Sequence, residues 1–435
     1  MGFPGLDEIF VFLSQVKPLT AWEALVVSSS AFQEFRIMDE VECVRELNSD
    51  RLLLRLYAER VLDGKRVLGE SSLVLNPLDE FRSRVRRSIE MAALVKNEPF
   101  DLPGPGQHYS EVETHDPTMA ANPFHHIATV RKRLEVKSRQ EQVVLSSSEV
   151  WIEEKRRTFR NSLGIEAGYS ETELFVDFVC LAKDGLGHES ESHGCRKVRR
   201  LQDLDPDSMV ARNARFARDT LSAEEPPTGE FDVVFSHESL DSLFNYFVAQ
   251  SGGPAAYHGW SRFKNGEPVV SEVAGDRITL TSDPALPGGL KSLPFDDNGL
   301  SMRPVKVIEN GLLCQRPVEK RYAQYLRLEP SGAFANVVIE PGATPFDSLF
   351  NPKPVLHCVR FSTFDPDPVS GAFSGEIRLG YWLTDSGVKP VKGGSVSGVM
   401  ENAFRRATFS SETVQREAYH GPKGVKLCNL AVAGS

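Results

Sequence analysis

The chain has 435 residues, of which 40% are hydrophobic and 25% charged, and its formal net charge at pH 7 is -10. This composition is typical of a soluble globular protein with two or three domains, and the acidic balance argues against binding to nucleic acid or an anionic membrane. Because the six cysteines form no CxxC pair and no apolar run could cross a bilayer, we expect a cytoplasmic protein without disulfides or a signal peptide.

The first part of the chain predicts a small sheet covered by a helix. The strand candidates are residues 23–27, 41–47, 52–57 and 67–75. Asp63-Gly64 marks a hairpin turn between the last two. Apolar residues then recur at helical spacing over residues 78–95, which predicts a helix. We therefore assign residues 1–120 to an N-terminal α+β domain.

A segment rich in Pro, Gly and His, residues 100–124, separates this region from a second patterned one. Residues 127–142 predict a charged helix, and residues 143–151, 156–162 and 172–181 predict strands. Asp205-Pro206 is a typical helix start, and the helix that follows carries Arg212, Arg215 and Arg218 on the side away from its apolar face. On an acidic protein these arginines indicate a solvated face rather than a nucleic-acid stripe. Residues 121–225 are thus a central α+β domain.

The remaining residues, 226–435, predict a β-rich domain. It opens with a strand at 231–235 and a helix at 238–250 whose apolar stripe, from Leu240 to Val248, indicates one uninterrupted helix. Strand and turn patterns follow to the end of the chain. The predicted fold class is therefore α+β, with N-terminal sheet-plus-helix domains followed by a β-rich C-terminal domain.

One string has the residue types of a metal site. His188 and His193 enclose an HExxxH pattern, which in a helix could supply two imidazole ligands and a general base. Here it follows an Asp184-Gly185 turn and has no apolar stripe, so a polar strand after a hairpin turn is the better interpretation. His125 and His126 are a second weak candidate for metal binding.

Other catalytic patterns are weak. GSVSG at 394–398 resembles a nucleophile elbow but has Val396 where the nucleophile should stand. Asp296-Asp297 lies among turn residues, where aspartate is favoured for backbone hydrogen bonding. His237-Glu238 is interpreted as a helix start with an acid at its positive end.

Short motifs along the C-terminal half occur in a defined order. They are PFDDNG at 294–299, VIENGLL at 307–313, SG at 331–332, IEPG at 339–342, SGAFS at 370–374, VSG at 396–398 and LAVAG at 430–434. Upstream, NSLG at 161–164 and Leu204-Asp205 continue the series. In content and order the chain resembles the TldD/PmbA metallopeptidase family, formerly called modulators of DNA gyrase.

In TldD-type members of that family, the helix after the first C-terminal strand carries HExxxH, and a cysteine near the C-terminus completes a zinc site. The resemblance places Asn245, Tyr246 and Gln250 at the His, Glu and His positions. A neutral amide is a poor zinc ligand and a tyrosine is a poor base at neutral pH. We therefore expect a TldE-type chain with no catalytic residue and no metal of its own. These three positions would then line a peptide groove, and Cys428 would be a small buried side chain.

The resemblance implies that the chain pairs with an HExxxH-containing TldD-type subunit, which would hold the zinc, and that the pair cleaves unfolded or leader peptides. This chain would contribute partner contacts and show no peptidase activity alone. Two alternatives remain open. One is a diverged, self-sufficient metal-dependent enzyme in a biosynthetic pathway, with His188, His193, His125 or His126 as ligands; the other is a homodimeric peptide-binding module.

Overall fold

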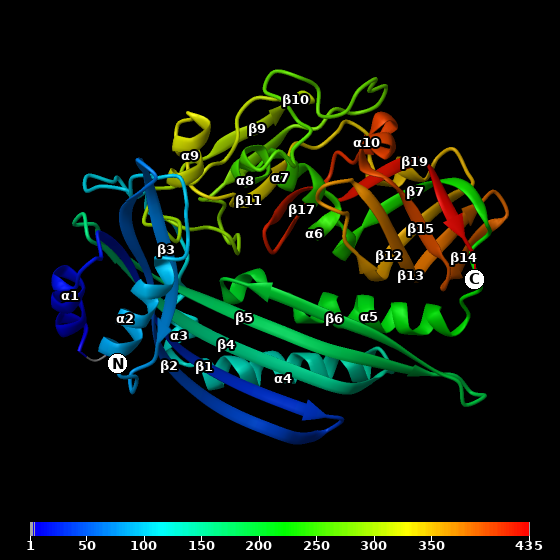
Figure 1. Cartoon of the computed structure of the whole chain (residues 1–435). Helices are drawn as coiled ribbons and strands as arrows, with labels where there is room; N and C mark the ends of the chain where they lie inside the picture. Colours follow the sequence, from blue (N-terminus) through cyan, green and yellow to red (C-terminus); the bar gives the residue numbers. More distant parts are fainter. Residues whose placement is uncertain (1–2, 4, 435) are drawn as a thin grey trace.

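A computed structural model describes residues 3 and 5–434 (Figure 1). Its N-terminal half is built on one antiparallel sheet in the order β3-β2-β1-β4-β5-β6. The strands are β1 (Ala21–Ile37), β2 (Glu40–Leu62), β3 (Lys65–Leu75), β4 (Val144–Asn161), β5 (Glu166–Lys183) and β6 (Glu189–Val198). The predicted hairpin turn at Asp63-Gly64 is confirmed, since both residues adopt positive φ between β2 and β3.

Five helices belong to the described residues of this half of the chain and pack against the sheet. They are α1 (Leu6–Gln15), α2 (Phe81–Ala92), α3 (Pro117–Ala121), α4 (Pro123–Gln140) and α5 (Pro206–Leu221). The last two share a core with β4 and β5 that includes Leu134, Phe178 and Ala214. Asp205 caps α5 as predicted, because its side chain accepts a hydrogen bond from the backbone N–H of Ser208.

The strand pairing runs across the predicted boundary at residue 120. β1 and β4 are paired from Glu23–Asn161 to Ile37–Ser147, so the segments assigned to two domains contribute to the same sheet. The division into 1–120, 121–225 and 226–435 stays a prediction.

The C-terminal part is β-rich, as predicted, and contains two sheets. The first has the order β10-β9-β8-β11-β18-β17, from β8 (Leu280–Asp283), β9 (Val305–Glu309), β10 (Leu312–Leu313), β11 (Asn336–Ile339), β17 (Thr413–Arg416) and β18 (Tyr419–Pro422). The second has the order β12-β7-β19-β15-β13-β14, from β7 (Gly229–Ser236), β12 (Val355–Phe364), β13 (Ala372–Thr384), β14 (Gly387–Val391), β15 (Ser395–Val399) and β19 (Gly424–Ala433). Because β12 also pairs with β13, this second sheet closes on itself.

Short elements connect the two C-terminal sheets around a common core. They are β16 (Thr408–Phe409), the helices α6 (Leu240–Leu243), α7 (Asn245–Ser251), α8 (Gly253–Tyr257), α9 (Lys320–Leu326) and α10 (Met400–Ala403), and the 3₁₀ turns η2 (His237–Ser239), η3 (Phe346–Phe350) and η4 (Phe404–Arg406). A further 3₁₀ turn, η1 (Leu201–Asp203), lies between β6 and α5. Over the described part of the chain, no helix has both the length and the apolar character needed to span a membrane.

The prediction of one uninterrupted helix over residues 238–250 is wrong. η2, α6 and α7 follow one another, and the break between α6 and α7 lies at Phe244, whose φ and ψ are -95° and 1°. The Phe244 ring packs against Phe404 and Tyr419 in the common core. Tertiary packing of this aromatic side chain therefore overrides the helical pattern of the sequence.

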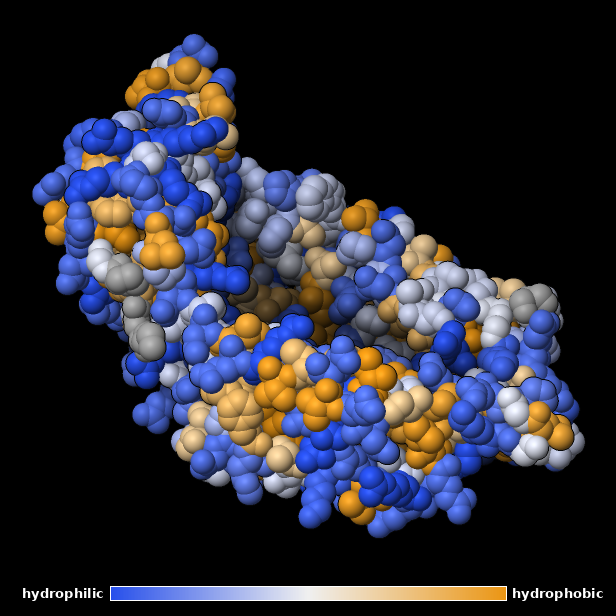
Figure 2. All heavy atoms as spheres, turned by 90° about the horizontal axis from the view of Figure 1, so that it is seen from below, coloured by the Kyte–Doolittle hydropathy of each residue, from blue (hydrophilic) through white to orange (hydrophobic). Residues whose placement is uncertain are grey.

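The face seen from below the sheet carries scattered apolar side chains among hydrophilic ones (Figure 2). In Figure 1 the hairpin of β1 and β2 lies at this lower side. Five apolar residues around its turn are between 44% and 54% exposed: Ile37, Met38, Val41, Val44 and Leu47. β3 pairs with β2 only from Leu52 onward, so residues 40–51 of β2 have no strand on their outer side among the described residues.

Candidate functional site

The three positions named from the family resemblance lie on α7 and have different environments. Asn245 is exposed, and its side-chain amide is 3.4 Å from the Asp365 carboxylate. Tyr246 is fully buried and donates a hydrogen bond from its hydroxyl to Glu401 on α10. Burial raises the pKa of Tyr246, and the hydrogen bond to Glu401 raises it further, so the phenol stays protonated at neutral pH.

Gln250 is also fully buried, and the backbone around it occupies its amide. The side-chain NH₂ donates to the carbonyls of Pro368 and Trp260 at 2.7 and 3.2 Å, and the side-chain carbonyl accepts from the N–H of Arg262 at 2.6 Å. A buried amide in this state has a structural role, since each of its groups has a protein partner.

These residues do not fit a zinc ion. Two amides and a protonated phenol replace the imidazole and carboxylate donors that zinc prefers, and the buried amide is already hydrogen-bonded.

Cys428 lies on β19, and its side chain is less buried than the sequence predicts. It is half-exposed beside a register shift in the pairing of β19 with β7, and its thiol contacts the Arg406 carbonyl at 3.4 Å. Burial raises the pKa of Cys428 to about 11.

The HExxxH string at 188–193 lies at a hairpin turn and on β6, as the sequence predicts. His188 hydrogen-bonds Asp184 at 2.7 Å, whereas His193 hydrogen-bonds Asp177 at 2.5 Å. Residues five apart on a strand point to opposite faces and are separated by roughly 16 Å. The structure therefore does not bring His188 and His193 together.

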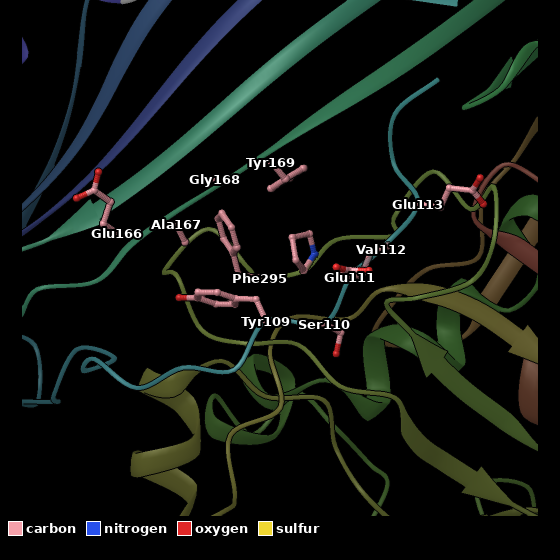
Figure 3. A pocket seen from close by; sticks show the side chains of 11 residues that line it. Tyr109, Ser110, Glu111, Val112, Glu113, Glu166, Ala167, Gly168, Tyr169 and Phe295 are labelled. Atoms are coloured by element: carbon pink, nitrogen blue, oxygen red, sulfur yellow. The ribbon is translucent and has the colours of Figure 1, made fainter. Parts of the chain in front are cut away.

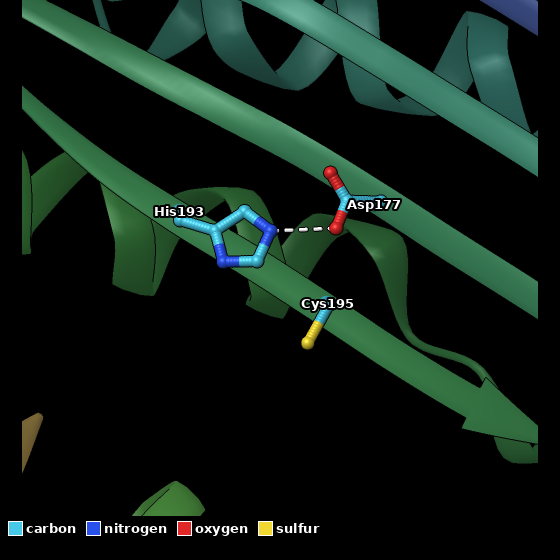
Figure 4. Close-up of side chains that lie close together, drawn as sticks. All are labelled: Asp177, His193 and Cys195. Carbon is cyan, nitrogen blue, oxygen red and sulfur yellow. Dashed lines mark hydrogen bonds and ion pairs between the residues drawn. The ribbon is translucent and has the colours of Figure 1, made fainter. Parts of the chain in front are cut away.

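His193 instead belongs to a group that sequence reasoning missed (Figure 4). Asp177 lies directly across from Cys195 in the pairing of β5 with β6, and His193 is two residues before Cys195 on the same face. The three donor atoms lie within 4.8 Å of one another. Burial raises the pKa of the Cys195 thiol, as does the charge of Asp177, so the thiol is protonated at neutral pH. The spacing of His193 and Cys195 could have indicated this group, but the partner strand could not be known.

The histidines at 125 and 126 lie in the first turn of α4. Their rings contact each other edge to face at 5.4 Å, and the ring of His126 hydrogen-bonds the Thr118 carbonyl. Within the described residues, neither joins a group of three or more possible metal ligands.

The PFDDNG segment forms one wall of a cavity of about 820 Å³ between the N-terminal sheet and the C-terminal part (Figure 3). Phe295 projects between the rings of Tyr109 and Tyr169, each with its centroid 5.2 Å away. Glu111, Glu113 and Glu166 are further lining residues. The cavity is thus aromatic in its centre and acidic at its sides.

Asp296, next to Phe295, has the turn role that the sequence predicts. Its carboxylate accepts hydrogen bonds from the N–H groups of Asn298 and Leu300 at 2.9 and 3.0 Å. Burial nevertheless raises the pKa of Asp296 to about 7. Asp297 is exposed, so the two carboxylates do not form a catalytic pair.

Comparison with known proteins agrees with this architecture. Residues 228–434 match the family described as the PmbA/TldA metallopeptidase C-terminal domain. Residues 228–434 are thus a C-terminal domain of the PmbA/TldD type. The resemblance inferred from its motifs is therefore confirmed.

Individual PmbA/TldD relatives are distant. The chain is 26% identical over 267 residues to a metalloprotease of Methanothermobacter thermautotrophicus, a match that covers 56% of this chain and 57% of the relative. It is 26% identical over 284 residues to metalloprotease PmbA of Escherichia coli, with 64% and 62% covered. The chain thus spans about three fifths of the length of the curated relatives it matches.

The PmbA/TldD fold extends over the whole chain. The crystal structure of TldE from Thermococcus kodakarensis superimposes with a TM-score of 0.82 and 18% sequence identity, covering 99% of this chain and 100% of that one. At this identity the likeness concerns the fold.

Proposed function

We propose that this chain is a non-catalytic, TldE/PmbA-like subunit of a heterodimeric zinc metallopeptidase that acts on unfolded or leader peptides. The proposal rests on the side chains that α7 carries at the motif positions. Asn245, Tyr246 and Gln250 stand where the family's metal-binding motif is expected, and the two buried side chains among them are hydrogen-bonded to the protein itself. Zinc and the general base would then come from a TldD-type partner.

The turn of the β1 and β2 hairpin is the surface that we assign to partner contact. It combines exposed apolar side chains with the unpaired outer edge of β2 at residues 40–51. Exposed apolar patches and open strand edges are features of association surfaces.

Co-expression with the TldD-type paralogue from the same genome, followed by native mass spectrometry, tests the proposal. We expect a one-to-one assembly with one zinc ion, which remains with the partner when the subunits are separated. A lone chain that holds zinc and cleaves peptides would overturn the proposal.

A pair of variants tests the contact surface. Val44→Asp places a charge beside the hairpin turn and should weaken assembly, whereas Val11→Asp, at a similarly exposed position on α1, should not. Equal assembly of both variants would exclude the hairpin as the contact.

The cluster of Asp177, His193 and Cys195 favours a second candidate, a chain that binds its own metal ion. Imidazole, thiolate and carboxylate are all zinc ligands, and the three donors already lie close together. Zinc content of the purified single chain distinguishes the candidates. Metal that is lost in His193→Gln but kept in His188→Gln would support this second function.

A further inference from the structure

A cavity of about 640 Å³ lies between α5 and the C-terminal sheets, and basic and aromatic side chains dominate its wall. A second cavity of about 300 Å³ adjoins it and shares Arg215, His237, Phe346 and His357 with it. Together the two are large enough for an organic ligand of moderate size. They include none of Asn245, Tyr246 and Gln250.

The larger cavity has an excess of positive charge. Arg212 and Arg215 reach it from α5, Arg416 from β17, and Lys423 from the segment before β19, whereas Glu412 is the acidic side chain in the same wall. The sequence predicted a solvated face for the α5 arginines. For Arg212 this is wrong, because its side chain is only 26% exposed beside the C-terminal part.

Arg212 is incompletely paired. Its nearest carboxylate oxygen, on Glu238, is 3.8 Å from the guanidinium, and its buried Nε has no hydrogen-bond partner among the described residues. Glu238 is shared with Arg360 and Arg416, at 3.5 and 3.7 Å. Arg416 also pairs with Asp241 at 2.9 Å, so it has a carboxylate of its own, whereas Arg212 and Arg360 share Glu238 and leave positive charge uncompensated. Buried polar groups normally have a hydrogen-bond partner, so the Nε of Arg212 indicates that a ligand could bind here.

The backbone beside Arg212 is strained. His237 has φ of 57°, in the left-handed region that residues other than glycine rarely adopt. Burial lowers the pKa of His237 to about 4 and that of His357 to about 3. Both imidazoles are therefore neutral at pH 7, and His357 hydrogen-bonds Ser236 at 2.7 Å. The positive charge in the cavity thus comes from the arginines and the lysine.

The adjoining cavity supplies an apolar surface. Its wall includes Phe350, Val359, Leu383 and Val388. Asp219 also lines it, and its carboxylate accepts a hydrogen bond from the Tyr381 hydroxyl at 2.6 Å. An anion held by the arginines could therefore extend an apolar group along this wall without burying a second charge.

We propose that these cavities form a binding site for an organic carboxylate that carries an apolar group, with Arg212 as its principal anchor. The planar guanidinium offers parallel N–H donors that match the two oxygens of a carboxylate. The ligand can be a free acid or the C-terminus of a peptide, because both present the same carboxylate. The site goes beyond the proposed function, since it does not require the partner subunit or zinc.

Isothermal titration calorimetry of the full chain tests the site with four probes. They are 3-phenylpropanoate, its neutral amide, a pentapeptide ending in phenylalanine with a free carboxylate, and inorganic phosphate. We expect at least one of the two carboxylates to bind, and the amide and phosphate to bind at least tenfold more weakly or not at all. Which carboxylate binds identifies the source of the ligand.

Variants assign the binding to this cavity. Arg212→Gln should weaken binding about ten- to hundredfold, as expected for the loss of a hydrogen bond to a charged group. Val388→Asp, at a position 58% exposed and therefore tolerant of substitution, should also weaken binding by placing a charge on the apolar wall. Arg87→Gln on exposed α2 surface should bind like the parent chain.

Thermal unfolding of each variant verifies that it is folded before titration. The proposal is overturned if neither carboxylate binds, if the amide or phosphate binds as tightly as the carboxylates, or if Arg212→Gln binds like the parent chain.

Discussion

The hydroxyl of Tyr57 donates a hydrogen bond of 2.8 Å to the buried carboxylate of Glu23, across the pairing of β1 and β2. Arg55, the direct strand partner of Glu23, has its guanidinium 3.6 Å from the same oxygen. Neither contact offsets the desolvation of the carboxylate, because burial raises the pKa of Glu23 to about 7. Asp296 lies close enough to raise the same pKa by repulsion.

These raised pKa values predict how stability depends on pH. In the unfolded chain Glu23 and Asp296 release their protons near pH 4, but in the folded protein they retain them to about pH 7. The folded state therefore binds more protons in this window, and stability falls as pH rises from about 4 to about 7. Glu23→Gln should remove part of this fall. The free energy of unfolding of the variant minus that of the parent chain should be about 1–3 kcal/mol more favourable to the variant at pH 8 than at pH 4.

Urea unfolding at pH 4, 6 and 8 measures this effect. Asp297→Asn, at the exposed neighbour of Asp296, is the control and should follow the parent profile. If the stability of Glu23→Gln depends on pH in the same way as that of the parent chain, the prediction is wrong.

Gln250 is expected to stabilise α7 rather than to act chemically. Gln250→Ala removes its side-chain hydrogen bonds and leaves the Pro368 carbonyl and the Arg262 N–H without that partner. We expect a loss of about 2–4 kcal/mol in the free energy of unfolding. Asn245→Ala, on the exposed side of the same helix, should change it by less than about 0.5 kcal/mol. Chemical denaturation of the two variants compares them, and similar losses would be inconsistent with the structure.

Tyr246 should behave as a structural residue as well. Tyr246→Phe retains the buried ring but removes the hydrogen bond to Glu401, which should cost about 1–2 kcal/mol. Thermal unfolding at constant pH measures the loss. Tyr257→Phe, at a position 39% exposed, is the control and should be neutral. A Tyr246 variant as stable as that control would show that the bond to Glu401 contributes nothing.

Glu238 should stabilise the fold, because its carboxylate lies 3.5 to 3.8 Å from three guanidinium groups. Glu238→Gln removes the negative charge that faces Arg212 and Arg360, whereas Arg416 retains its pair with Asp241 at 2.9 Å. We expect a loss of about 3–5 kcal/mol, the cost of breaking a buried ion pair by removing one partner. Asp365→Asn, which removes a carboxylate charge in a loop, is the control and should have a much smaller effect on the free energy of unfolding. A high-salt buffer that restores the Glu238 variant to parent stability would argue that these charges are solvated instead.

Local sequence signals predicted much of the fold. Asp205-Pro206 marked the start of α5, Asp63-Gly64 marked a hairpin turn, and the polar strand after residue 188 is present. These features depend on near neighbours in the chain, and sequence patterns record such neighbours well. The break at Phe244 depends on rings at 404 and 419, which no local pattern reveals.

The candidate sites were harder to predict for the same reason. Cys195 and Asp177 meet only because β5 and β6 pair in one register, and Glu238 meets Arg360 and Arg416 only in the folded C-terminal part. In the sequence, Glu238 was interpreted as an acid at a helix start. In the structure it instead lies 3.5 to 3.8 Å from arginines of three separate segments.

The pairing of β1 with β4 has a practical consequence for shortened forms of this protein. A chain that began at residue 121 would retain β4 but lose its neighbour, and would expose the backbone N–H and C=O groups that normally bond β1 between Ser147 and Asn161. An open edge of that length is a template for strand addition by other molecules. Proteolytic fragments that separate the two segments should therefore self-associate rather than remain monomeric.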